Sequence, residues 1–402
     1  MISADSTGRL WNRNFILLAF GNLFMAIGFY FLMPTLPVYV VDVLGANKHD
    51  VGYILAAYTI SALLIRPFTG MAVDIWGRKW IYIGSFAVFT VILATYPLLH
   101  SFGMLLFLRF LHGFAWGINS TSGQTAVVDI IPLNKRGRGI GYFGISFTIS
   151  MAIGPLIALY ILSIGGFAIM FLTAALFSLA GWILILFVRF PGIRFPSEQV
   201  RFSWSKFIEK TSIPVAIPQI LFGMTYGSVI SFITIFAKET NLNETGQFFL
   251  VIAIGIFISR LFTGQIFDNR GPKFLMISGF LISMAGFILL ATLVNPAGFL
   301  TSAFLIGMGS GILMPTMTTM VNNMIGIERR GAANATISTA FDLGIGMGSL
   351  LLGVLSEAIG LKNMYLSCSL ILFSGFLFYI LFVNRFYQQR RTAMIKNKAY
   401  EP

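Results

Sequence analysis

Runs of about twenty apolar residues, separated by short polar segments, follow one another along nearly the whole chain. A helix of roughly 20 apolar residues crosses the 30 Å hydrocarbon core of a bilayer, so each run is long enough to span a membrane. The pattern predicts twelve such helices, six in each half of the chain. Their expected ranges are 14–41, 51–70, 80–98, 103–125, 139–163, 167–190, 213–237, 246–266, 273–294, 297–320, 332–357 and 362–384.

The layout of the first half recurs in the second half at an offset of 194 residues. The matched positions are 66–70 with 260–264, Asp74 with Asp268, Gly77 with Gly271, Gly113 with Gly307, Gly117 with Gly311, and 136–137 with 330–331. Internal symmetry in a chain this apolar is typical of membrane transporters built from repeats. We therefore expect two pseudo-symmetric six-helix bundles, 1–190 and 213–402. A polar cytoplasmic linker, 191–212, would join them, and a short basic tail would end the second bundle.

Composition agrees with a membrane protein and excludes a soluble one. Hydrophobic residues make up 57% of the chain and charged residues only 10%, against about a quarter in soluble domains. Cys368 is the only cysteine, so neither an internal disulfide nor a cysteine cluster for a metal is expected. The sequence contains no phosphate-binding loop and no nucleophile–base pair, which disfavours an enzyme or an ATP-driven pump. We expect no cofactor and a monomeric protein.

The net charge of +13 is distributed unevenly along the chain. Three basic residues fall in the predicted outer loops and three lie within helices, which leaves 21 of the 27 in predicted cytoplasmic segments. The six exceptions are Lys48, Lys238, Lys362, Arg66, Arg109 and Arg260. This positive-inside asymmetry places both termini in the cytoplasm of a multi-pass protein, for which we expect a bacterial plasma (inner) membrane. It argues against nucleic-acid binding, which needs a basic patch on one soluble face.

Three motifs carry a family resemblance that covers the whole chain. They are Gly70-x-x-x-Asp74-x-x-Gly77-Arg78-Lys79 with its weaker copy at 264–273, Leu105-x-x-x-Arg109-x-x-His112-Gly113, and the series Gly141, Gly144, Gly154-Pro155. The chain resembles the major facilitator superfamily, in particular its twelve-helix drug:proton antiporter branch. The resemblance implies that Asp74 and Arg78 stabilise an outward-facing state. It also associates the glycine series with antiporters, although Ala158 stands where glycine is frequent.

The first motif and the Gly-Pro step form our candidate gating set. Its members are Gly70, Asp74, Gly77, Arg78, Lys79, Asp268, Gly154 and Pro155. Asp74 can accept hydrogen bonds from a helix N-terminus or pair with an arginine, which would make a releasable latch. Pro272 replaces the arginine in the second copy, so we expect a weaker latch there. The alternatives are a static turn for the loop and ordinary small-residue packing for the glycine series.

Positions that break the repeat are candidates for the coupling chemistry. Offsetting Arg109 gives Ala303, and offsetting Asp342 backwards gives Thr148. Asp342 is expected about 16 Å along its helix, near the bilayer midplane, where an ionisable group is functional by default. We predict that it carries a proton or anchors a cationic substrate; a structural hydrogen-bonded carboxyl is the alternative.

Helix 4 is predicted to carry a polar stripe that includes Arg109, His112 and Trp116. Family resemblance implicates the arginine in proton coupling, and it could also hold an anionic group. His112 either joins the proton relay or serves only as a hydrogen-bonding partner between helices. Arg66 and Arg260 are expected to be interfacial anchors or latch partners, and Asp129 to pair with the basic run 135–138.

The substrate cavity would be lined by helices 1, 4, 7 and 10. The candidate residues are Asn22, Tyr30, Met33, Trp116, Asn119, Tyr226, Met314 and Asn322. Many Phe and Met side chains would make this lining adaptable, although such side chains also face lipid. The sequence thus favours proton-coupled export of a small amphiphilic organic molecule, with protons and that molecule as partners. Proton symport of a sugar or organic acid, or a sensor or lipid flippase, are the alternatives.

Overall fold

A computed structural model describes residues 9–46, 50–190, 208–242 and 245–399. The chain forms two compact units: unit 1 holds Met1–Leu133 and Phe143–Phe207, and unit 2 holds Asn134–Tyr142 and Ile208–Pro402. Most of the predicted linker, residues 191–207, lies outside the described residues.

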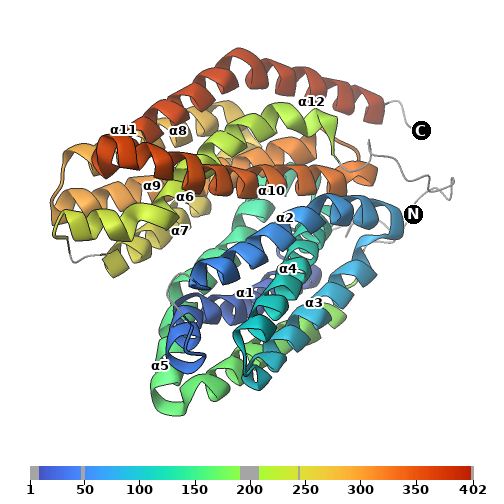
Figure 1. Ribbon diagram of the computed structural model, residues 1–402. Helices are drawn as coiled ribbons and strands as arrows, with labels where there is room; N and C mark the ends of the chain where they lie inside the picture. Colours follow the sequence, from blue (N-terminus) through green and yellow to red (C-terminus); the bar gives the residue numbers. More distant parts are fainter. Residues whose placement is uncertain (1–8, 47–49, 191–207, 243–244, 400–402) are drawn as a thin grey trace. The chain divides into compact units, whose positions relative to one another are not determined.

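Unit 1 contains the helices that are blue to green in Figure 1. They are α1 (Arg13–Val38), η1 (Tyr39–Val43), α2 (Asp50–Trp76), α3 (Arg78–Thr95), η2 (Tyr96–Leu98), α4 (Phe102–Ile130) and most of α5 (Arg136–Leu186). The first residues of α5 belong to unit 2, so one helix serves both units.

Unit 2 contains the helices coloured yellow to red in Figure 1. They are η5 (Lys210–Ser212), α6 (Ile213–Glu239), α7 (Thr245–Arg270), α8 (Pro272–Thr292), α9 (Pro296–Asn323), η6 (Ile327–Arg329), α10 (Arg330–Met347), η7 (Gly348–Leu352), α11 (Gly353–Phe378), η8 (Tyr379–Val383) and α12 (Asn384–Ala399).

Within the described part of the chain, nine helices are long and apolar enough to cross a membrane. The two longest, Leu133–Leu186 and Ile327–Thr392, each contain a glycine with positive φ, namely Gly166 at 72° and Gly360 at 79°. This conformation breaks a helix and favours glycine, so each long span is two apolar segments. Counting each of these two spans twice turns nine spans into eleven segments. Helix α4 is the twelfth; it is not among the nine because its polar stripe lowers its hydropathy. The twelve predicted segments are therefore present, and the all-α membrane fold is confirmed.

The 194-residue repeat is also present in the packing. Gly113 of α4 lies against the backbone carbonyl of Tyr58 in α2, and Gly307 of α9 lies against that of Ile252 in α7. Tyr58 and Ile252 are themselves separated by 194 residues. The breaking glycines Gly166 and Gly360 obey the same offset. The two units therefore repeat their helix registers as well as their motifs.

Candidate functional site

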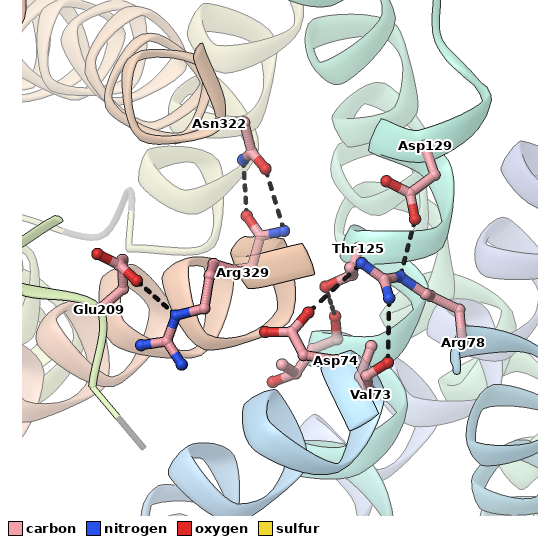
Figure 2. Close-up of polar contacts among 10 residues, drawn as sticks. Val73, Asp74, Arg78, Thr125, Asp129, Glu209, Asn322 and Arg329 are labelled. Carbon is pink, nitrogen blue, oxygen red and sulfur yellow. Dashed lines mark hydrogen bonds and ion pairs between the residues drawn. The ribbon is translucent and has the colours of Figure 1, made fainter. Parts of the chain in front are cut away.

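The first motif forms a buried charge cluster in unit 1 (Figure 2). Arg78 donates from Nε to Asp129 Oδ2 at 2.8 Å, and its other nitrogens reach Asp74 Oδ1 at 3.4 Å and the Val73 carbonyl at 3.2 Å. Gly77, at φ 91°, ends α2 and lets α3 start directly with Arg78. The arginine therefore ties the end of α2 to the end of α4.

The structure locates the remaining members of the first motif and refines the expectation for Asp129. Asp129 pairs with Arg78, whereas the sequence pointed to the run 135–138. Lys79 is exposed, and its Nζ lies 4.6 Å from the Trp80 ring centroid. An exposed ammonium group beside an aromatic ring is typical of a membrane interface. Gly70 is buried within α2, one turn before Asp74.

The second copy of the motif also holds its aspartate, but through different donors. In unit 2, Asp268 accepts hydrogen bonds from the backbone N–H groups of Gly137 (2.8 Å) and Arg138 (3.1 Å), at the N-terminus of α5. Arg138 Nε lies 3.4 Å from the same carboxylate. A guanidinium and a helix N-terminus thus replace the arginine lost to Pro272. The expectation of a weaker second latch stays a prediction.

The close backbone approach at this point requires glycine. A Cβ on Gly137 would lie 2.8 Å from Asp268 Oδ1 and 2.9 Å from the carbonyl oxygen of Gly264. Arg136, one residue earlier, donates to the Asn322 carbonyl at 2.7 Å and to Asn323 Oδ1 at 2.8 Å, so it caps the C-terminus of α9. The start of α5 is therefore fixed to α7 and α9 inside unit 2.

Asn322, which the sequence suggested as a substrate ligand, is instead engaged in a helix–helix pair. Its Nδ2 donates to Asn334 Oδ1 of α10 at 2.7 Å, and Asn334 Nδ2 returns a bond of 3.4 Å; these are the two dashed lines that leave Asn322 in Figure 2. The same Nδ2 donates to the Thr318 carbonyl at 2.9 Å. Both side chains have no exposed surface. Because the amide is used in packing α9 against α10, we remove Asn322 from the substrate set.

Sequence reasoning missed an anchor at the start of α6. Glu209 accepts a hydrogen bond from Arg329 Nε at 2.9 Å (Figure 2). It also accepts one from the backbone N–H of Thr211 at 3.1 Å, and its own backbone N–H donates to Thr336. Burial alone would raise the pKa of Glu209, but the bonds from Thr211 and Arg329 outweigh it and lower the pKa below its ordinary value. Nothing in the local sequence pairs residues 120 positions apart.

The polar stripe of α4 lies inside unit 1. Arg109, His112 and Asn119 are 1%, 0% and 1% exposed, and Trp116 stacks on Phe29 at 4.7 Å. Arg66 also faces this helix, because it is buried and donates to Ser120 Oγ at 3.1 Å. Of the two expectations for Arg66, an interfacial anchor with its charge in water is therefore wrong.

The other substrate candidates of unit 1 lie where α1 meets α5. Asn22 donates to Ser146 Oγ at 2.7 Å, and the ring of Tyr30 packs edge-on against Phe147. A Cβ on Gly154 would approach the Cβ of Tyr30 to 2.7 Å, so the Gly154-Pro155 step is a point of close helix contact. Met33 is exposed.

Unit 2 holds Asp342, Tyr226 and Met314, all partly exposed. Asp342 lies on α10, which packs against α6 through Gly344, and the following η7 packs against α6 through Gly348. The Tyr226 ring of α6 is 5.8 Å from the ring of Phe341, the neighbour of Asp342. Arg109 and Asp342 thus belong to different units. Among the described residues, no group of three His, Cys, Asp or Glu side chains could hold a metal ion.

The sequence profile of the Major Facilitator Superfamily matches residues 18–349. The staphylopine export protein of Staphylococcus aureus strain Mu50 is 25% identical over 347 residues, which cover 82% of this chain and 86% of that protein. The quinolone resistance protein NorA of strain COL is 25% identical over 360 residues, covering 86% and 90%. These relatives agree with the resemblance to the drug:proton antiporter branch.

Two solved structures share the fold. The human organic anion transporter MFSD10 superposes with a TM-score of 0.76 at 15% identity, covering 91% of this chain and 98% of its own. The Escherichia coli fucose:proton symporter FucP gives 0.75 at 14% identity, covering 95% and 99%. From the profile match and these relatives, the chain belongs to the major facilitator superfamily, and is a multi-pass membrane transporter of small molecules rather than an enzyme.

Proposed function

We propose that this protein exports a small amphiphilic organic compound across a bacterial plasma membrane in exchange for protons. The observation that carries the proposal is similarity over more than four fifths of the chain to an export protein and a resistance protein. Uptake by proton symport uses the same fold, so the direction of flux is the quantity to be tested.

The coupling role is proposed for Asp342, with Arg109 and His112 assisting. Each unit carries ionisable side chains that its repeat partner lacks, because Ala303 corresponds to Arg109 and Thr148 to Asp342. A carboxylate that gains and loses a proton on a membrane helix can bias alternating states. The gating role is proposed for the two loop motifs, in which Arg78 and Asp268 already hold helix ends.

Everted membrane vesicles with an acidic interior test the coupling. Adding a quinolone or ethidium should dissipate the proton gradient, measured by the fluorescence recovery of acridine orange, because export of the compound into the lumen releases protons. Asp342→Asn should abolish this recovery. Asp42→Asn is the matched control, because Asp42 is an exposed carboxylate in η1. A fully active Asp342→Asn variant would remove the proposed role, and compound uptake driven by protons into the cell would favour symport.

A further inference from the structure

Arg109 and His112 leave several hydrogen-bonding groups unused in the interior of unit 1. Nε and Nη1 of Arg109 and Nε2 of His112 have no hydrogen-bond partner among the described residues, although the two side chains are 1% and 0% exposed. The residues are three positions apart on α4, so they share one face of the helix. Buried polar groups are nearly always paired, so these atoms need an explanation.

The unused groups are all donors in one tautomer of the histidine. The Tyr96 hydroxyl lies 3.0 Å from Nδ1 of His112 and interacts electrostatically with Arg109. When this hydroxyl donates to Nδ1, the neutral imidazole carries its proton on Nε2. The guanidinium of Arg109 carries donors only and has no acceptor atom; besides the two unused nitrogens, it hydrogen-bonds to the Tyr96 hydroxyl. The face then presents N–H groups alone, which is the chemistry that binds an anion.

Aromatic rings surround these donors and contribute no carboxylate. The guanidinium of Arg109 lies 4.5 Å from the centroid of the Tyr58 ring. His112 has ring neighbours at centroid distances of 4.4 Å (Phe89), 5.8 Å (Tyr58), 5.9 Å (Tyr96) and 6.4 Å (Phe29). A cation–π contact returns less free energy than burial of a guanidinium costs, so the charge of Arg109 is not balanced by its ring.

The described acidic side chains of unit 1 are located elsewhere. Asp74 and Asp129 bind Arg78, and Asp42 is exposed in η1. Asp129 is also 20 residues further along α4 than Arg109, or about 30 Å. Across the described residues, Arg109 makes no ion pair within 4.0 Å. The described part of unit 1 therefore supplies no counter-charge for this arginine.

We propose that Arg109 and His112 form a buried site for one monovalent anion, held by charge-assisted hydrogen bonds and walled by Phe29, Tyr58 and Phe89. Two sources share this chemistry: the carboxylate of a transported compound, and free chloride. The first source deepens the proposed export function and rests on it, since it would make the substrates carboxylate-bearing compounds with an apolar body. The second source is independent of any transported compound.

Anion titration of the purified full-length protein tests the site without requiring transport. Benzoate, its neutral analogue benzamide, and chloride would be titrated at fixed ionic strength in a sulfate background. The readouts are tryptophan fluorescence and melting temperature. Trp116 is a suitable reporter because its ring lies 6.1 Å from that of Phe89. We expect saturable effects of benzoate, chloride or both, and none of benzamide.

Substitutions at Arg109 assign the effect to this site. Arg109→Gln should weaken anion binding at least about tenfold, because it removes the charge and the donor fork. Arg109→Lys keeps the positive charge but loses the fork of donors, so it should weaken benzoate binding about tenfold. This variant replaces Arg109→Gln in the test if the glutamine variant does not fold. Arg66→Gln is the matched control: Arg66 is a buried arginine of the same unit that hydrogen-bonds to Ser120, and its loss should leave anion affinity unchanged.

The outcomes separate the two sources and the two proposals. Saturation by benzoate supports a substrate carboxylate, while saturation by chloride alone supports an inorganic anion. Absence of binding by either anion, or equal affinity in wild type and both Arg109 variants, would overturn the site. Failure of proton exchange in vesicles would refute the export proposal but leave a measured anion affinity intact.

Discussion

At the scale of single residues, two buried arginines of unit 1 are in opposite electrostatic situations. Arg78 is 4% exposed and reaches two carboxylates and a carbonyl. Arg109 is 1% exposed and faces aromatic rings. A charge balanced by partners holds structure together, whereas a charge left without a counter-ion is available to a ligand. The two arginines should therefore respond differently to substitution.

Replacing Arg78 by alanine should destabilise the protein by about 3 kcal/mol, because it removes the guanidinium from two buried carboxylates. The melting temperature of the purified protein measures this loss. Lys79→Ala is the control: Lys79 is exposed and its ammonium group lies over the Trp80 ring, so a small effect is expected there. Equal melting temperatures for the two variants would show that the Arg78 cluster contributes nothing to stability.

Local motifs predict the residues of this cluster, but not their partners. The spacing of the motif alone singles out Asp74, Gly77 and Arg78. The pairing of Arg78 with Asp129 spans 51 residues and depends on the packing of α2, α3 and α4. The position of Asn322 could not be predicted for the same reason, because its partner Asn334 lies across a helix–helix contact.

At the scale of helices, glycines set the spacing between neighbours. Gly307 of α9 touches the backbone of Ile252 in α7, and Gly311 lies against Ile256 one turn further on. Backbone atoms cannot move aside as a flexible side chain can, so these positions tolerate no Cβ without separation of the helices. Glycines that face open space, such as Gly84 of α3, carry no such constraint.

Gly307→Ala should therefore destabilise the protein by about 1–3 kcal/mol through overpacking. Gly84→Ala should be neutral or stabilising by up to about 1 kcal/mol, because alanine is the better helix former and no atom lies within 4 Å of the added Cβ. Thermal melting of both variants gives the comparison. If Gly307→Ala melted no lower than Gly84→Ala, the α7–α9 contact would be looser than the structure places it.

Hydropathy predicts the helix number well and the helix ends less well. The predicted gap between 163 and 167 coincides with the helix break at Gly166. A glycine with positive φ interrupts the helical hydrogen bonding there without adding polar residues. The last helix continues as α12 to Ala399, beyond its predicted end at 384. Polar side chains there end the apolar run but not the helix, since helix propensity does not depend on hydropathy.

At the scale of the whole molecule, the charge asymmetry and the repeat together predict how the chain is oriented in the membrane. Each bundle of six helices returns the chain to the side from which it started, so the basic loops of both halves must face the same compartment. The positive-inside rule assigns that compartment to the cytoplasm. On this basis we expect the exposed Lys79 to face inward, and the exposed Lys362, which follows the break at Gly360, to face outward.

Cysteine labelling of intact cells tests this orientation directly. Cys368 is buried, with its sulfur 3.3 Å from Ser228 Oγ, so Cys368→Ser gives a cysteine-free background with little change in volume. In that background a membrane-impermeant maleimide should label Lys362→Cys in intact cells, but label Lys79→Cys only after permeabilisation. Arg385→Cys, exposed near the start of α12, should behave like Lys79→Cys and place the C-terminal end inside. The opposite pattern would invert the topology. Labelling of both Lys362→Cys and Lys79→Cys from outside would contradict the odd number of crossings expected between them.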